Sequence, residues 1–358
     1  MKGTTIEKIV IEKDAFEQCA AYVQQKGWKN ILIIADKNTQ RAAGGMLSKC
    51  FLEKSLQVQT CLIEPDQNGD VKADEISIVQ ALIGIDAKTD VLVAVGSGTI
   101  HDITRFCSDK TGVPFVSIPT APSVDGFTSV GAPIIVRGMK KTFKAVSPQA
   151  LFADIKVLMK APDEMIAAGF GDMLAKFTSL ADWKFGHLTA KEPYSEEAAL
   201  ITERALNRCV KHVDSIAEKQ EEGIRALMET LIESGIAMLK FGQSHPASGG
   251  EHHLSHYWEM NFIQENRPQV LHGAKVGAAT ALITRTYKER AEKLPCRAGV
   301  ELIPDPDEIV RLLQRAGAPA SPSELGIEPE LVKASLRDAH TLRDRYTMLR
   351  YINENEIT

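Results

Sequence analysis

Residues 90–102 read DVLVAVGSGTIHD, an apolar run that leads directly into a glycine-rich turn. Such a run is typical of a strand buried on both faces of a parallel sheet. The glycines after it let the backbone approach a phosphate closely, and the free N–H groups of a following helix favour negative charge. The third glycine of the GxGxxG fingerprint is absent. The turn is therefore predicted either to bind phosphate or to serve only as a tight connection.

The flanking segments repeat the same alternation of strand and helix. Apolar runs predict further strands at 30–36, 58–64 and 114–120, and helical patterns occupy 37–55 and 74–84. Alternation at this pitch is typical of a parallel, doubly wound sheet. We therefore expect an α/β domain with a parallel, Rossmann-like sheet over residues 1–158.

From about residue 160 the pattern changes to long helical segments. Apolar residues recur at three- and four-residue spacing in 161–188, 192–219, 220–243 and 251–262. The sequence predicts an all-helical second domain over residues 159–358.

Composition excludes several classes of protein. The 358 residues include 42 Lys and Arg and 47 Asp and Glu, which gives a net charge of -5. This balance argues against nucleic acid as a partner. No apolar stretch is long enough to span a bilayer, and charges interrupt the first residues, so we expect a cytoplasmic protein without membrane insertion. The six cysteines show no paired spacing and are expected to be reduced thiols.

Polar side chains follow two of the predicted strands. Asp36 ends the strand at 30–36, where a carboxylate can accept a hydrogen bond from an adenosine ribose hydroxyl and would repel a 2′-phosphate. The loop SIPTAPSVDGFTS at 117–129 carries hydroxyl groups and one carboxylate, Asp125. It leaves a strand at the carboxyl edge, where ligands bind in open α/β sheets. Taken alone, this composition is more typical of a polar surface loop.

Histidines cluster in the second domain. The segment SGGEHHLSH at 248–256 places His252 and His256 on one helix face, and His272 begins another helical segment. Upstream, GFGDMLAK at 169–176 carries Asp172. Two imidazoles and one carboxylate form an open divalent-metal set suited to Zn²⁺, Ni²⁺ or Fe²⁺. Asp172 could instead cap the next helix, and isolated histidines are usually structural.

Five motifs occur together in one order: GSGTIHD, SIPTAPSVDGFTS, GFGDMLAK, PASGGEHHLSH and LHGAKVG. This order resembles the dehydroquinate synthase-like, metal-dependent alcohol dehydrogenase superfamily, and within it the bacterial branch of the sn-glycerol-1-phosphate dehydrogenase family. The resemblance spans about residues 30 to 290. It implies reversible reduction of dihydroxyacetone phosphate to sn-glycerol 1-phosphate by NADH or NADPH, a role in phospholipid biosynthesis, and a homodimer or larger oligomer.

The resemblance also implies roles for individual residues. Metal would bind Asp172, His252 and His272; zinc is implied in archaeal members and nickel in some bacterial ones. Substrate would contact Asp125, Asp172 and His256, with Asp172 and His256 also catalytic. The implied dinucleotide-binding residues are Asp36, Gly96, Ser97, Gly98, Thr99, Ile100, Asp102, Thr120, Ser123 and Ser129.

Alternatives on the same scaffold remain open at this stage. They are a glycerol dehydrogenase, a dehydroquinate synthase-like lyase and a non-catalytic sugar-phosphate sensor. A substrate phosphate also needs a cationic partner. The candidates are Lys176 and a basic cluster after the loop, comprising Arg137, Lys140, Lys141 and Lys144. The composition of the cluster favours a solvated charged surface slightly over phosphate binding.

Overall fold

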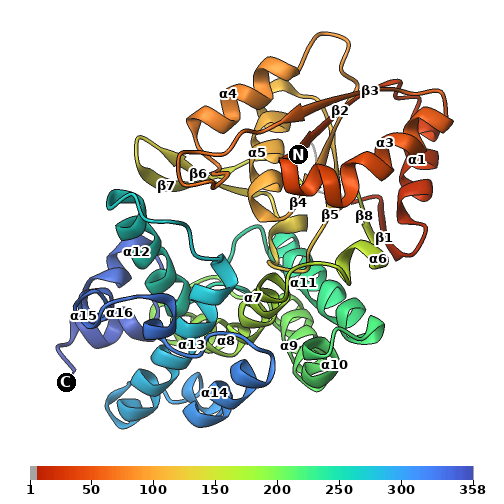
Figure 1. The fold of residues 1–358 in the computed structure, drawn as a ribbon. Coiled ribbons are helices and arrows are strands. Elements are labelled where there is room, and N and C mark those ends of the chain that lie inside the picture. The colour runs from red at the N-terminus through yellow and green to blue at the C-terminus, as the bar shows by residue number, and fades with distance from the viewer. Residues whose placement is uncertain (1–5, 358) are drawn as a thin grey trace. The chain divides into compact units, whose positions relative to one another are not determined.

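A six-stranded parallel sheet organises the first part of the computed structural model, which describes residues 6–357 (Figure 1). Its strands are ordered β1-β8-β5-β4-β2-β3, and every neighbouring pair runs parallel. Their bounds are β1 (Lys8–Glu12), β2 (Asn30–Ala35), β3 (Gln57–Leu62), β4 (Val91–Gly96), β5 (Phe115–Pro119) and β8 (Ala150–Asp154). All six residues of β4 are buried, which agrees with a central strand covered on both faces. The predicted α/β fold class is confirmed.

Helices cover both faces of this sheet (Figure 1). On one face, α1 (Ala15–Gln25) and α3 (Gly45–Glu53) share an apolar core with side chains such as Ile31 and Ile33. On the other face, α4 (Glu75–Gly84) and α5 (Gly98–Thr111) share a second core with the alternate residues of the same strands. This division follows from the two-residue period of a strand. The short helix α6 (Ile155–Leu158) follows β8.

Several elements differ from the sequence-based expectation. No pattern predicted β1, α1 or β8, nor the antiparallel hairpin of β6 (Gly131–Val136) and β7 (Met139–Lys144). The helix expected over 37–55 consists of α2 (Lys37–Thr39), a π-helical turn (Gln40–Gly44) and α3. A short 3-10 turn also forms at Gly126–Thr128.

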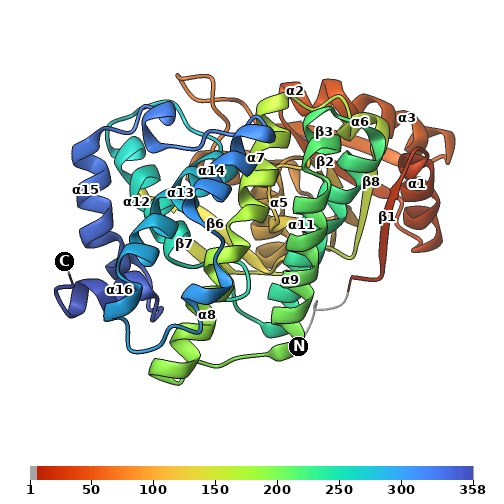
Figure 2. The same ribbon diagram turned by 90° about the horizontal axis from the view of Figure 1, so that it is seen from below.

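The second part of the chain is helical, as predicted, and Figure 2 shows it from below. Its α-helices are α7 (Asp163–Leu174), α8 (Lys176–Ala190), α9 (Glu196–Lys211), α10 (Val213–Ala217), α11 (Glu221–Phe241), α12 (Gly250–Gln264), α13 (His272–Glu289), α14 (Pro306–Arg315), α15 (Pro329–Asp338) and α16 (Met348–Glu354). Short 3-10 turns lie at Ala291–Lys293, Val300–Leu302, Pro322–Leu325 and Ala339–Leu342. Helix α13 packs against α7, α12 and α14.

Glycines allow α7 and α13 to approach each other with their backbones in contact. A Cβ atom on Gly171 would lie 2.6 Å from the Gly273 carbonyl oxygen, and one on Gly273 would overlap the Ala168 carbonyl group. Only glycine fits both positions, because any side chain would push the helices apart. The crossing places Asp172 and His272, each next to one of these glycines, on the two facing helices.

The described chain forms two compact units. One contains the described residues through Pro122 together with Gly126–Pro162, and the other contains Ser123–Asp125 and the residues from Asp163 onward. The boundary expected after residue 158 falls close to Pro162, whereas assignment of the loop segment Ser123–Asp125 to the second unit was not expected. Residues 1–5 of the predicted first domain lie outside the described residues. No helix in the described part is long and apolar enough to cross a membrane.

Candidate metal centre and dinucleotide site

Three side chains of the second unit converge as the histidine pattern predicted. Asp172, His252 and His272 each offer one ligand atom, and these atoms all lie within 4.8 Å of one another. Asp172 is fully buried and His252 is nearly so, whereas His272 is partly exposed. One carboxylate and two imidazoles suit a divalent transition metal and leave coordination positions for water or substrate. The donor set therefore fits the metal ion that the resemblance implied.

The three donors come from three helices. Asp172 lies in the last turns of α7, His252 in the first turn of α12, and His272 is the first residue of α13. The alternative that Asp172 caps the following helix is wrong, because Ala175 occupies the N-cap position of α8.

Glu251 fixes the orientation of His252. Its Oε1 lies 2.7 Å from His252 Nδ1, so Nδ1–H donates and Nε2 presents a lone pair toward Asp172 Oδ1, 3.7 Å away. Burial raises the pKa of Glu251, but hydrogen bonds from His252, the Thr178 hydroxyl and the Gly249 N–H outweigh it and lower that pKa to about 2. A carboxylate behind a metal-binding histidine raises its basicity as a ligand.

We expect Glu251→Gln to weaken metal binding by about 10- to 100-fold, because the substitution removes the charge that orients and polarises His252. Competition against a chromophoric chelator measures the affinity. Glu197→Gln is the matched control, since the Glu197 side chain is 69% exposed on α9, and it should leave the affinity unchanged. Equal affinities for the Glu251 variant and the parent protein would contradict the assigned role.

Asp125 and Lys176 form a buried ion pair beside the metal donors. Lys176 Nζ lies 2.8 Å from Asp125 Oδ2, 3.3 Å from Asp172 Oδ1 and 3.2 Å from the Ala247 carbonyl oxygen. Burial lowers the pKa of Lys176, but the two carboxylates outweigh it and hold that pKa above its usual range. Burial and repulsion by Asp172 raise the pKa of Asp125. The Asp125 N–H also donates to Asp172 Oδ2 at 2.9 Å, so the loop and the lysine both position Asp172.

His256 lies next to the same cluster. Its ring centroid is 6.4 Å from that of His252 and 5.9 Å from that of His272. Arg343 Nη2 donates to His256 Nε2 at 2.7 Å, and His256 Nδ1 faces Glu259 Oε2 at 3.5 Å. An arginine cannot accept a hydrogen bond, so Nε2 is the acceptor and the imidazole carries its proton on Nδ1. The contact with Arg343 was not predicted.

The glycine-rich turn of the first unit also fits a phosphate ligand. Gly96 ends β4, and a Cβ atom there would lie 2.7 Å from Ile100 Cβ. Ser97 occupies the N-cap of α5, but its side chain does not cap the helix, so Gly98 and Thr99 open the first turn without that acceptor. The exposed N–H groups of a long helix favour an anion here. The Ile100 side chain is buried in the apolar core, so only the backbone N–H of this residue could contact such an anion.

The other predicted dinucleotide residues have structural partners. Asp36 accepts hydrogen bonds from the N–H groups of Asn38 and Thr39 and caps α2. Asp102 pairs with buried Arg105, which also donates to carbonyl groups at Gly126, Phe127 and Gly131.

Three hydroxyl residues complete the predicted set. The Thr120 N–H donates to the Gly96 carbonyl, which ties the end of β5 to the glycine-rich turn. The Ser129 hydroxyl hydrogen-bonds to Gly131. Buried Ser123 is assigned to the second unit, whereas the other predicted dinucleotide residues are assigned to the first.

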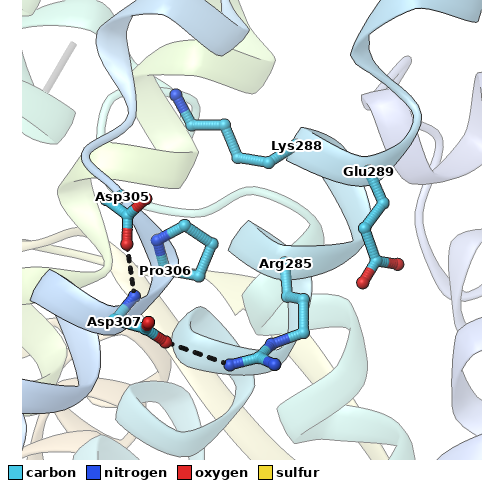
Figure 3. Close-up of a pocket in the computed structure, with 6 residues that line it drawn as sticks. All are labelled: Arg285, Lys288, Glu289, Asp305, Pro306 and Asp307. Carbon is cyan, nitrogen blue, oxygen red and sulfur yellow. Dashed lines mark hydrogen bonds and ion pairs between the residues drawn. The ribbon is translucent and has the colours of Figure 1, made fainter.

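A shallow pocket elsewhere in the second unit contains none of the predicted site residues (Figure 3). It lies between the last turns of α13 and the first turn of α14 and is lined by Arg285, Lys288, Glu289, Asp305, Pro306 and Asp307. Arg285 and Asp307 pair across it, and both side chains are mostly exposed. The pocket is therefore a charged surface feature, separate from the metal donors.

Comparison with known proteins places this chain in a family. The family model described as iron-containing alcohol dehydrogenase matches residues 10–162. A glycerol-1-phosphate dehydrogenase [NAD(P)+] of Geobacillus stearothermophilus is 49% identical, over 98% of this chain and 93% of the relative. Its Bacillus subtilis counterpart is 48% identical, over 98% and 92%. The chain belongs to the glycerol-1-phosphate dehydrogenase family.

The wider fold extends beyond this family. A solved glycerol dehydrogenase from Schizosaccharomyces pombe superimposes with a TM-score of 0.74 at 19% identity, covering 96% of this chain and 84% of that structure. In this member of the glycerol-1-phosphate dehydrogenase family, three residues near the metal donors were not predicted from the sequence. These are Glu251, Arg343 and the buried carboxylate Asp182, which accepts hydrogen bonds from the Gly250 N–H and the Tyr287 hydroxyl.

Proposed function

We propose that this protein catalyses the reversible reduction of dihydroxyacetone phosphate to sn-glycerol 1-phosphate with NADH or NADPH. The observation that carries the proposal is the convergence of Asp172, His252 and His272 on one point of the helical unit. Membership of the glycerol-1-phosphate dehydrogenase family supports the substrate and the dinucleotide. No specific observation favours the lyase or the sensor.

Each unit supplies one part of the proposed chemistry. A divalent ion held by the three donors would polarise the C2 carbonyl of the ketone and stabilise negative charge on its oxygen, while the dinucleotide supplies the hydride. The turn from Gly96 to Asp102 would hold the dinucleotide phosphates, and Asp36 would hold the adenosine ribose. Thr120, Ser123 and Ser129 would contact the rest of the dinucleotide.

The chain's own residues would bind the substrate and move the proton. Asp125 is proposed to contact the substrate, and Lys176 holds its carboxylate in place. His256 is proposed to contact the substrate and to exchange a proton at the C2 oxygen. In the observed arrangement Arg343 occupies His256 Nε2, so a substrate that attracts Arg343 would free that nitrogen.

Zinc or nickel is the proposed ion, since two imidazoles and a carboxylate suit both. Elemental analysis of the purified protein identifies the ion that it carries. Activity restored to the chelated protein by only one of the two metals would name the ion that supports catalysis.

Oxidation of NADH and NADPH, followed at 340 nm with dihydroxyacetone phosphate and with dihydroxyacetone, tests the function. We expect strong preference for the phosphorylated ketone and a product that an sn-glycerol-3-phosphate dehydrogenase does not oxidise. Preference for the unphosphorylated ketone would contradict the proposal and indicate a glycerol dehydrogenase. Phosphate release without net oxidation would indicate the lyase.

We also propose that the protein is a cytoplasmic homodimer that serves phospholipid biosynthesis. One face of α4 exposes Ile76, Val79 and Ile83, three apolar side chains at helical spacing that a second copy would cover. Light scattering during size-exclusion chromatography measures the mass in solution. A mass equal to that of one chain would contradict the dimer.

A further inference from the structure

Arg343 places a guanidinium group beside the histidine cluster of the second unit. The residue follows the 3-10 turn Ala339–Leu342 and precedes α16, and it is partly buried. Nη2 donates to His256 Nε2 at 2.7 Å, and Nη1 donates to the Ser248 hydroxyl at 3.1 Å. Both partners are neutral. Within residues 6–357 no carboxylate lies at ion-pair distance from Arg343.

No carboxylate among the described residues contacts the positive charge of Arg343 directly. Burial and the nearby Arg345 guanidinium lower the pKa of Arg343 to about 10, against the opposing effect of Glu251 and Glu259. The group therefore remains charged near neutral pH. Arg345, itself buried, donates to the Ser248 carbonyl at 2.8 Å, so the guanidinium groups of Arg343 and Arg345 both hydrogen-bond to Ser248. A partly buried cation whose direct hydrogen-bond partners are neutral is unfavourable, and binding an anion relieves that penalty.

The buried cations of this unit already face carboxylates. The ammonium group of Lys176 contacts the carboxylates of Asp125 and Asp172 and donates a hydrogen bond to the Ala247 carbonyl. Lys275 pairs with Glu259 at 3.5 Å, and Arg345 Nε lies 3.7 Å from Glu192. Lys176 is therefore not the phosphate ligand that the sequence suggested. Arg343 differs from all three in facing only neutral acceptors among the described side chains.

The position of Arg343 suits one end of the proposed substrate. Arg343 touches His256, whose ring lies 5.9 Å from the ring of the metal donor His272. In dihydroxyacetone phosphate, one carbon and one oxygen separate the C2 carbonyl carbon from phosphorus. With the ketone oxygen at the metal donors, the phosphate would therefore lie close enough for the Arg343 side chain to reach it. The planar fork of arginine matches two phosphate oxygens.

We propose that Arg343, aided by the Ser248 hydroxyl, binds the phosphate dianion of the substrate and so selects the phosphorylated ketone over dihydroxyacetone. This assignment rests on the proposed function. Arg343 is a specificity-determining residue, and its transfer from His256 to the phosphate would leave His256 Nε2 available at the reacting end.

Arg343→Gln in the metal-loaded full-length protein tests the assignment. We expect the ratio of kcat/KM for dihydroxyacetone phosphate to kcat/KM for dihydroxyacetone to fall by about 10²- to 10³-fold, as for loss of one partner of a buried charge pair. Arg343→Lys should recover part of that ratio, because it restores the charge but not the fork. Arg337→Gln is the control, since its side chain is 73% exposed on α15.

Titration of the metal-loaded protein with inorganic phosphate gives a readout that is independent of turnover. We expect binding to the parent protein and to Arg337→Gln, and binding weakened at least about tenfold in Arg343→Gln. Unchanged phosphate binding, or equal loss of kcat/KM for both ketones, would overturn the role of Arg343. A parent protein that reduces neither ketone would contradict the proposed function, while the phosphate titration would still decide the role of Arg343.

Discussion

Replacing His272 with alanine is expected to lower kcat for dihydroxyacetone phosphate reduction by at least about 10³-fold, while NADH still binds. The substitution removes one of three converging donors, and Lewis-acid stabilisation of the developing charge amounts to several kcal/mol. The glycine-rich turn that is proposed to hold the dinucleotide lies in the other unit and does not include this residue. Steady-state turnover measures kcat, elemental analysis measures the bound metal, and NADH fluorescence titration measures the dinucleotide affinity.

His187→Ala provides the matched control for this variant. His187 lies on α8 with its Nδ1 hydrogen-bonded to the Glu192 carbonyl, and it is exposed. We expect unchanged metal content and turnover in the control. If His272→Ala kept parental activity after treatment with a chelator, the metal-dependent chemistry would be wrong.

The second large effect concerns stability. Lys176→Met is expected to lower the free energy of unfolding by about 3–5 kcal/mol, the usual result of removing one partner from a buried ion pair. Lys176 is fully buried, and without it the Asp125 carboxylate retains the Ser234 hydroxyl as a partner but loses its cation. Urea denaturation followed by circular dichroism, at fixed metal concentration, measures the change.

Lys184→Met on the same helix isolates the effect of burial. Its ammonium lies 3.8 Å from Glu196, whose side chain is 86% exposed, and such surface pairs contribute about 0–1 kcal/mol. A Lys176 variant as stable as this control would show that the buried pair does not hold Asp125 in place.

The sequence predicted the parallel sheet and the shared helix face of His252 and His256 because both depend on local periodicity. Strand β4 is uniformly apolar, and His252 and His256 share a face at four-residue spacing. His272 begins a helix, as the pattern indicated. Each of these features can be read from a window of a few residues.

Features that depend on tertiary contact were not predicted. Arg343 lies in an irregular segment and reaches His256 from 87 positions further along the chain. Glu251 precedes a predicted ligand, but its role appears only when its carboxylate meets Nδ1. Lys176 was a candidate for phosphate binding until the fold placed two carboxylates and a carbonyl around it. No periodicity encodes such contacts, because they join elements that are distant in sequence.

The glycine contact between α7 and α13 has a consequence for heat tolerance. With the main chains touching at Gly171 and Gly273, the backbones of the neighbouring residues Asp172 and His272 stay close unless the helices themselves part. An ion that binds the folded protein and not the unfolded chain raises the melting temperature as its concentration rises. A metal-starved culture should therefore accumulate a protein that denatures at lower temperature, even though its amino-acid sequence is unchanged.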